Sequence, residues 1–167
     1  MRVLGVDPGS AATGYGIVER HAGRYEYLTA GVIRGNRRLS FGGKLLNIHE
    51  TLCGLISDYL PAAMSLERSF VAANVQSAFR IGEVRAVALL AAARFRLPLF
   101  EYAPAQVKLA VAAHGQAAKA QVKLMVRRTL DLDAELELAD DAADALALAL
   151  CHLGQARLAG AAKVWRS

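Results

Sequence analysis

Arg2-Val3-Leu4-Gly5-Val6-Asp7-Pro8-Gly9-Ser10 follows the first methionine, and this stretch decides the fold. Residues 3–6 form a short apolar run with β-branched members, bounded by Pro-Gly, which predicts a buried strand. Pro8 removes a backbone donor and Gly9 permits a positive φ, so the chain can leave the sheet sharply. Asp7 then lies at the mouth of the strand. Because Asp is also common in solvated turns, Asp7 alone does not establish a function.

The remaining pattern predicts four more strands, at 14–19, 24–33, 62–67 and 98–101. Apolar residues at helical spacing predict a helix from 40 until Pro61, and an alanine-rich helix ends near 96. Two or three further helices complete the chain, beginning near 104 and spanning about 117–130 and 140–158. A three-strand meander followed by α/β units predicts an α/β fold with a mixed five-stranded sheet and helices on both faces.

The first and fourth strands of such a sheet should end close together. Ligands of these sheets gather outside the carboxyl ends of the strands. Asp7 and Glu67 are both predicted at such ends, so we expect the two carboxylates to converge. A length of 167 residues suits one domain, residues 1–167, with a substantial core.

Composition favours a globular, cytoplasmic protein. The chain is 54% hydrophobic, yet no apolar run reaches the length of about 18 needed to span a membrane. The apolar run before Asp7 is too short for the core of a signal peptide. Cys53 and Cys151 lie among helical apolar residues without metal-ligand spacing, which favours two reduced core thiols.

Charge is unevenly placed along the chain. Residues 131–144 hold seven acids and no bases, which leaves 20 basic and 8 acidic side chains elsewhere, a balance of +12. Such a basic surface is typical of a protein that binds a polyanion. Carboxylates repel phosphate unless divalent cations lie between them. A basic surface around a cluster of acids is therefore a more specific signal than the basic surface alone.

Three acids begin the otherwise apolar segment at 140–150. Asp140 is explained as an N-cap, and Asp141 as a first-turn acid that the helix dipole favours. The alanines and leucines around Asp144 predict burial, and an unpaired buried carboxylate costs several kcal/mol. Asp141 and Asp144, three residues apart, share a helical face. With Asp7 and Glu67 they would form an all-oxygen cluster that suits Mg²⁺ or Mn²⁺ rather than zinc.

Five blocks together resemble the RuvC family of Holliday-junction resolvases: residues 6–16, 66–70, 100–108, 119–122 and 141–147. The resemblance covers nearly the whole chain in order. It implies an RNase H-like fold, a homodimer, and paired, symmetric nicking of four-way DNA junctions in recombination and repair. It further implies two divalent metal ions in each active site, Mg²⁺ with Mn²⁺ as a substitute, and cooperation with the RuvA and RuvB branch-migration proteins.

The resemblance also assigns roles to residues. Asp7, Glu67, Asp141 and Asp144 match the catalytic metal ligands. Phe70 matches an aromatic residue that stacks on a base at the crossover, although it could instead pack on the following helix. DNA contacts are expected from the basic residues Lys108, Lys119, Lys123 and Arg80, although Lys119 and Lys123 could equally form a solvated helix face. The chain departs from the family at Ala73, where a lysine is frequent, and at residues 82–86, where the family's arginine is kept.

Three other functions are weighed against this one. An RNase H-like nuclease that acts on RNA would not need Phe70, Lys108 and Lys119. An actin-like or sugar-kinase-like phosphotransferase also opens with Asp-x-Gly, but it needs a second phosphate-binding glycine motif and a larger chain. A non-catalytic junction-binding protein has no reason to gather four carboxylates against phosphate.

Overall fold

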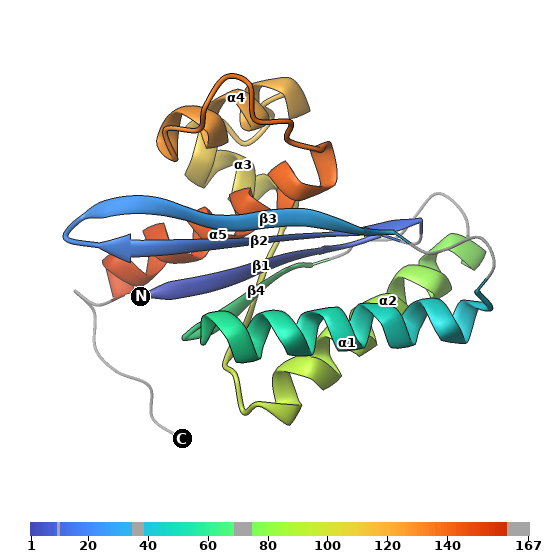
Figure 1. Ribbon diagram of the computed structural model, residues 1–167. Helices are drawn as coiled ribbons and strands as arrows, with labels where there is room; N and C mark the ends of the chain where they lie inside the picture. Colours follow the sequence, from blue (N-terminus) through green and yellow to red (C-terminus); the bar gives the residue numbers. More distant parts are fainter. Residues whose placement is uncertain (10, 35–38, 69–74, 160–167) are drawn as a thin grey trace.

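The computed structural model describes residues 1–9, 11–34, 39–68 and 75–159, which fold into one mixed sheet with helices on both faces (Figure 1). The strands are β1 (Arg2–Pro8), β2 (Ala12–His21), β3 (Arg24–Arg34), β4 (Ala63–Glu67) and β5 (Leu99–Tyr102). The helices are α1 (Phe41–Tyr59), α2 (Val75–Arg94), α3 (Pro104–Ala112), α4 (Lys119–Thr129) and α5 (Asp140–Ala159).

The sheet has the strand order β3-β2-β1-β4-β5. Strands β1, β2 and β3 pair antiparallel as a meander, while β1 pairs with β4, and β4 with β5, in parallel. The predicted mixed five-stranded sheet is therefore confirmed, as is the expectation that the first and fourth strands end side by side.

The end of β1 differs from the prediction in two details. Asp7 pairs with Gly14 and Pro8 with Thr13, so the strand continues past the carboxylate and Asp7 belongs to it. Gly9 has no positive φ. Glycine is needed at this position for a steric reason instead, because a Cβ there would lie 2.3 Å from the carbonyl oxygen of Ala12.

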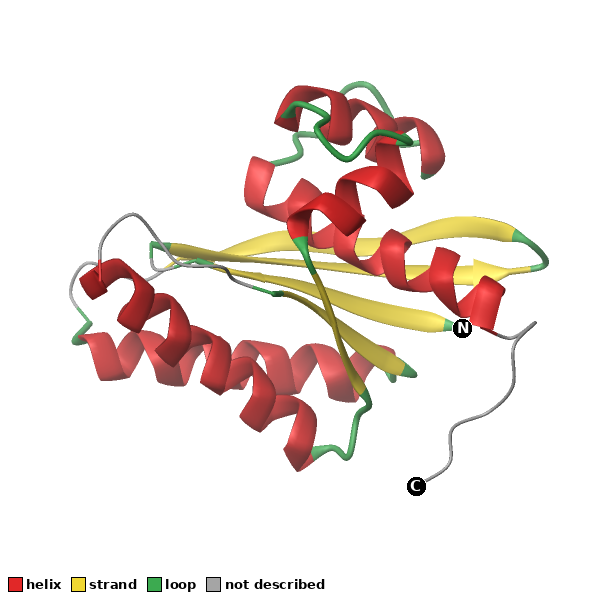
Figure 2. Ribbon diagram, turned by 180° about the vertical axis from the view of Figure 1, so that it is seen from behind, coloured by secondary structure: helices red, strands yellow, loops and turns green. Residues whose placement is uncertain are grey.

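The two faces of the sheet carry different helices. Figures 1 and 2 show α1 and α2 on one face and α3, α4 and α5 on the other. Each face has its own apolar core, one around Leu52 and Met64 and the other around Leu146 and Leu153. Within the described ranges, no helix has the length and apolar character needed to cross a membrane.

Helix α5 lies unusually close to the sheet because glycines face it. A Cβ on Gly5 would lie 1.9 Å from the carbonyl oxygen of Ala145, and a Cβ on Gly14 would lie 1.9 Å from that of Asp141. A Cβ on Gly16, which pairs with Gly5 across β1 and β2, would lie 2.7 Å from the Leu146 side chain and 3.0 Å from its backbone nitrogen. Glycine inside strands thus permits this close packing of backbone on backbone.

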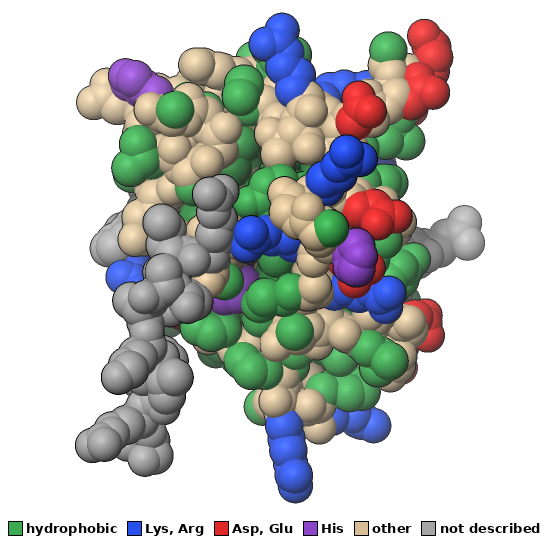
Figure 3. Space-filling model, turned by 90° about the vertical axis from the view of Figure 1, so that its left-hand side faces the viewer, with side chains coloured by type: hydrophobic (Ala, Val, Ile, Leu, Met, Phe, Trp, Pro, Cys, Tyr) green, Lys and Arg blue, Asp and Glu red, His purple; other side chains and the backbone are tan. Residues whose placement is uncertain are grey.

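Charges are interspersed at the end of the molecule where β1 begins. Figure 3 shows acidic and basic side chains side by side there, without a large patch of one sign on that face.

Both cysteines are free thiols. Cys151 is fully buried, as expected of a core residue, whereas Cys53 is only half-buried.

Candidate active site

A pocket of about 310 Å³ lies where β1 and β4 end beside α5. Asp7 enters it from β1, Glu67 from β4 and Asp144 from α5, and Lys108 and Lys119 line it from α3 and α4. The carboxylates that the sequence predicted to converge therefore share one cavity, although they come from segments about 60 to 140 residues apart in the chain.

The electrostatics of the pocket centre on Asp7. The pKa of this carboxyl is raised from 3.8 to about 8, mainly by burial and next by repulsion from Glu67 and a hydrogen bond between the two side chains. Asp144 and then Asp141 add smaller repulsive contributions to the same pKa. Burial and the neighbouring carboxylates thus both favour the protonated form of Asp7 in the metal-free pocket.

Side-chain contacts fix α5 on the sheet and so fix Asp141 and Asp144. The Ser65 hydroxyl on β4 donates to the carbonyl of Leu148 at 2.8 Å, and both groups are buried. The Tyr102 hydroxyl on β5 lies 2.7 Å from Nδ1 of the buried His152. These contacts hold the middle of the helix, and the glycine contact at Asp141 holds its beginning. Asp141 lies beside the pocket, near enough to Asp7 to affect its pKa.

Two lysine–aspartate pairs connect α4 to the first turns of α5. Lys119 Nζ lies 3.1 Å from Asp144 Oδ2, and Lys123 Nζ lies 2.7 Å from Asp140 Oδ1. The hydrogen bond with Asp144 raises the pKa of Lys119, and that with Lys123 lowers the pKa of Asp140. The expected N-cap role of Asp140 is therefore wrong, because Asp140 is the first helical residue and its carboxylate accepts from Lys123.

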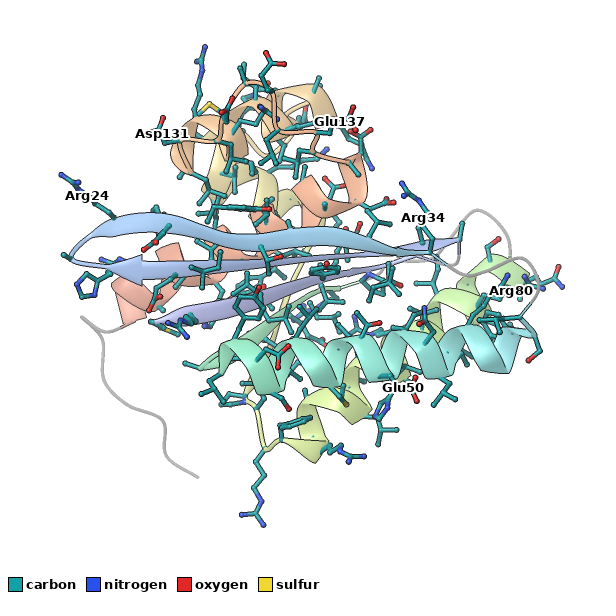
Figure 4. The ribbon with its side chains drawn as sticks, viewed as in Figure 1. Arg24, Arg34, Glu50, Arg80, Asp131 and Glu137 are labelled. Atoms are coloured by element: carbon teal, nitrogen blue, oxygen red, sulfur yellow. The ribbon has the colours of Figure 1, made fainter. Side chains whose placement is uncertain are left out.

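The other predicted DNA contacts are dispersed. Lys108 lines the pocket, whereas the Arg80 guanidinium lies 5.4 Å from the ring centroid of Phe41, near the start of α2. Figure 4 shows Arg80 and Arg34 at the same end of the sheet, the end at which β1 finishes. Phe70 and Ala73 fall outside the residues that the structure describes.

The sequence interpretation missed a contact behind Glu67. The Arg85 guanidinium on α2 donates to the backbone carbonyl of Glu67 at 2.5 Å and also pairs with the Glu101 carboxylate. The signal was present, because an arginine between the inward-facing Val84 and Ala88 of an apolar helix needs a buried partner.

The donors of the pocket are chemically suited to a hard divalent cation. They are carboxylate oxygens, which Mg²⁺ and Mn²⁺ prefer, and a cation among them would relieve the repulsion that helps to raise the pKa of Asp7. Among the described residues, no three acidic, histidine or cysteine side chains form a ready-made metal cage. One oxygen of the Asp144 carboxylate, Oδ2, accepts a hydrogen bond from Lys119, so a lysine lies directly beside this donor.

Comparison with known proteins gives one consistent answer. The family model described as crossover junction endodeoxyribonuclease RuvC matches residues 3–152. The RuvC of Myxococcus xanthus is 49% identical over 159 residues, which are 95% of this chain and 83% of that protein. The RuvC of Geobacter metallireducens is 45% identical over 93% of this chain and 94% of that protein.

Solved structures agree with the sequence relatives. Thermus thermophilus RuvC superposes with a TM-score of 0.84 at 34% identity, covering 95% of this chain and 96% of that one. The same protein in complex with a Holliday junction substrate gives a TM-score of 0.87 at 33% identity, with the same coverage. The chain therefore belongs to the RuvC family of crossover junction endodeoxyribonucleases, with the RNase H-like fold of that family.

Proposed function

We propose that this RuvC nuclease resolves four-way DNA junctions by paired, symmetric nicks, with Asp7, Glu67, Asp141 and Asp144 as the metal ligands of its active site. The observation that carries the proposal is the convergence of Asp7, Glu67 and Asp144 in one pocket beside two lysines. We further propose that residues 1–167 form a single nuclease domain and that the protein acts in the cytoplasm. Its two free thiols support that location.

The proposed chemistry divides between the acids and the lysines. Nucleases of this family generally use a divalent metal, which supplies positive charge at the phosphate and makes water nucleophilic at neutral pH. Asp7, Glu67 and Asp144 would hold Mg²⁺, with Mn²⁺ as a substitute, and Asp141 would help to hold a second ion. Lys119, which lines the pocket beside Asp144, would face the phosphate and stabilise charge that develops there, and Lys108 lines the same cavity.

A second copy of the chain is the proposed partner on the outer face of α2. Six small or apolar residues form an exposed stripe along one side of this helix, opposite its buried side. Val75 and Phe79 are more than 70% exposed, and Leu90 is 60% exposed. A two-fold interface along this stripe would place one active site at each of two symmetric junction strands. The stripe consists of Val75, Phe79, Gly82, Ala86, Leu90 and Ala93.

The experiment that tests the proposed function uses a plasmid with an extruded cruciform. With Mg²⁺, we expect two nicks at symmetric positions within the lifetime of one complex, which linearises the plasmid, and a sedimenting mass twice that of the chain. Linear duplex DNA and structured RNA should remain intact. Cleavage of the RNA, or cleavage of the junction without divalent metal, would contradict the proposal. Cooperation with RuvA and RuvB is inferred from the family alone.

Replacing Phe70 by Ala should slow the cutting of fully paired junctions. If the ring stacks on a base unpaired at the crossover, its loss costs about 1–3 kcal/mol of stabilisation. A junction with mismatches at the crossover has less unstacking left to do, so the variant should recover there more than the wild type gains. The measurement is the ratio of cleavage rates on the two substrates at saturating Mg²⁺. An equal loss on both would favour a core-packing role for the ring.

A further inference from the structure

Arg85 is a half-buried cation behind the active site, on the face of β4 and β5 that α2 covers. Its side chain is 19% exposed, and both of its charged contacts are to the sheet. Nη1 donates to the carbonyl oxygen of Glu67, the last residue of β4, and Nη2 pairs with the Glu101 carboxylate of β5. One guanidinium thus holds the ends of two neighbouring strands.

The backbone around Glu67 also contacts β5 directly. Glu67 pairs with Tyr102 at the last register position of β4 and β5, and the next residue bonds back through the Arg68 N–H to the carbonyl of Tyr102 at 2.8 Å. Arg68 Nε lies 3.9 Å from Glu101 Oε2, which adds a weaker, more exposed contact. Beyond Arg68 the structure describes no residue until Val75.

The side chain of Glu67 shares the pocket with other carboxyl groups. Asp7 and Asp144 line the same cavity, so an ionised Asp7 and Asp144 both repel the Glu67 carboxylate when no cation lies between them. Movement of Glu67 is opposed where its carbonyl is anchored by Arg85. Without the Arg85 hydrogen bond, the end of β4 could shift and move the Glu67 carboxylate away from the pocket. Binding of a metal ion would then be weaker.

We propose that Arg85 is a positioning residue that, through the Glu67 carbonyl and the Glu101 carboxylate, holds Glu67 in a metal-binding position. The proposal rests on the proposed function, in which Glu67 is a metal ligand. It assigns no contact between Arg85 and the substrate. Partners that orient a metal ligand commonly change metal affinity 10- to 100-fold when they are removed.

A matched control lies at the other end of the sheet. Arg2 makes the same two kinds of contact as Arg85, one to a carboxylate and one to a backbone carbonyl. Its Nε pairs with Glu19 Oε2 at 3.0 Å, and its Nη1 donates to the carbonyl of Tyr59 at 3.0 Å. Arg2 begins β1, whereas Asp7 lies near its other end. A purely structural arginine of this kind should affect stability without affecting the metal site.

The experiment titrates the junction-free protein with Mn²⁺ by calorimetry in the wild type and in R85Q, R2Q and E67Q. We expect R85Q to bind Mn²⁺ about tenfold more weakly and to need about tenfold more Mg²⁺ for half-maximal cleavage, with much of the rate restored at high Mg²⁺. R2Q should match the wild type in both measurements. Urea unfolding in EDTA gives the stability of each variant, and R85K, which cannot donate as a planar fork, should be intermediate.

The outcomes separate the inference from the proposed function. If E67Q weakens Mn²⁺ binding while R85Q binds as the wild type does, the positioning role is wrong and the proposed site stands. Equal weakening by R85Q and R2Q would reduce Arg85 to a structural residue. If E67Q binds Mn²⁺ normally, Glu67 is not a ligand, and both the assignment and the positioning role fail.

Discussion

Asp7→Asn is expected to abolish junction cleavage while leaving junction binding intact or stronger. Asn keeps the shape of the side chain but removes an anionic ligand that lines the pocket, and it also removes the negative charge that Asp7 carries when ionised. We expect the cleavage rate to fall by about 10³-fold, the upper end of the range that one electrostatic group contributes to catalysis. Single-turnover cleavage and gel-shift binding of the same labelled junction measure the two effects.

The same substitution should stabilise the metal-free protein. The pKa of Asp7 is about 8 in the folded protein and near 4 in the unfolded chain, so between these values the folded state binds the extra proton. Folding is therefore favoured by this group at low pH, and the metal-free wild type loses stability as the pH rises from about 4 to about 8. Asn cannot titrate, so the variant should lack this loss. Thermal unfolding in EDTA at pH 5 and pH 8 tests the difference.

Asp140→Asn is the control for loss of charge. Asp140 lies four residues before Asp144 on α5 and is paired with Lys123 as Asp144 is paired with Lys119, but it faces solvent and does not line the pocket. Cleavage by Asp140→Asn should remain near that of the wild type. Near wild-type cleavage by Asp7→Asn, or an equal loss in Asp140→Asn, would overturn the assignment of the acidic site.

The sheet and the pocket acids could be predicted because each has a local signature. The meander and the strand at Glu67 follow from apolar runs bounded by turn residues, and those patterns survive in the structure. Asp144 was identifiable because a carboxylate on an apolar helix demands compensation. The apolar residues around Asp144 predict from the sequence alone that its side chain is partly buried. The structure then shows which residues lie beside the carboxylate.

The contacts that hold the acids in place could not be predicted in the same way. Arg85 reaches Glu67 and Glu101 only because α2 packs on this face of the sheet, and Lys123 pairs with Asp140 only because α4 lies beside α5. Such pairings depend on the packing of helices onto the sheet, which the spacing of residues within one helix does not determine. Gly14 had a signal, since a glycine inside a strand marks a close approach.

Gly14→Ala should therefore reduce cleavage, although Gly14 lies in β2 and is not a residue of the pocket. Gly14 is the register partner of Asp7, and a Cβ there would lie 1.9 Å from the carbonyl oxygen of Asp141 and 2.4 Å from its carbonyl carbon. Both atoms are backbone, so no side-chain rotation relieves the clash, and the start of α5 must move outward. A displacement of about 1 Å at a catalytic group can cost roughly 10²-fold in rate.

The stability cost of Gly14→Ala should be modest beside its catalytic cost, about 1–3 kcal/mol for an overpacked contact. Gly31→Ala is the matched control, because Gly31 lies in β3 and its added Cβ would meet the end of the Tyr15 side chain, 2.6 Å from the hydroxyl oxygen, rather than α5. Cleavage per folded molecule is compared at 25 °C after urea unfolding has established the folded fraction of each variant. Equal cleavage by the two alanine variants would show that α5 tolerates the displacement. A large loss in Gly14→Ala alone would mean that the absence of a side chain at Gly14 of β2 sets the distance from Asp7 to Asp141 and Asp144.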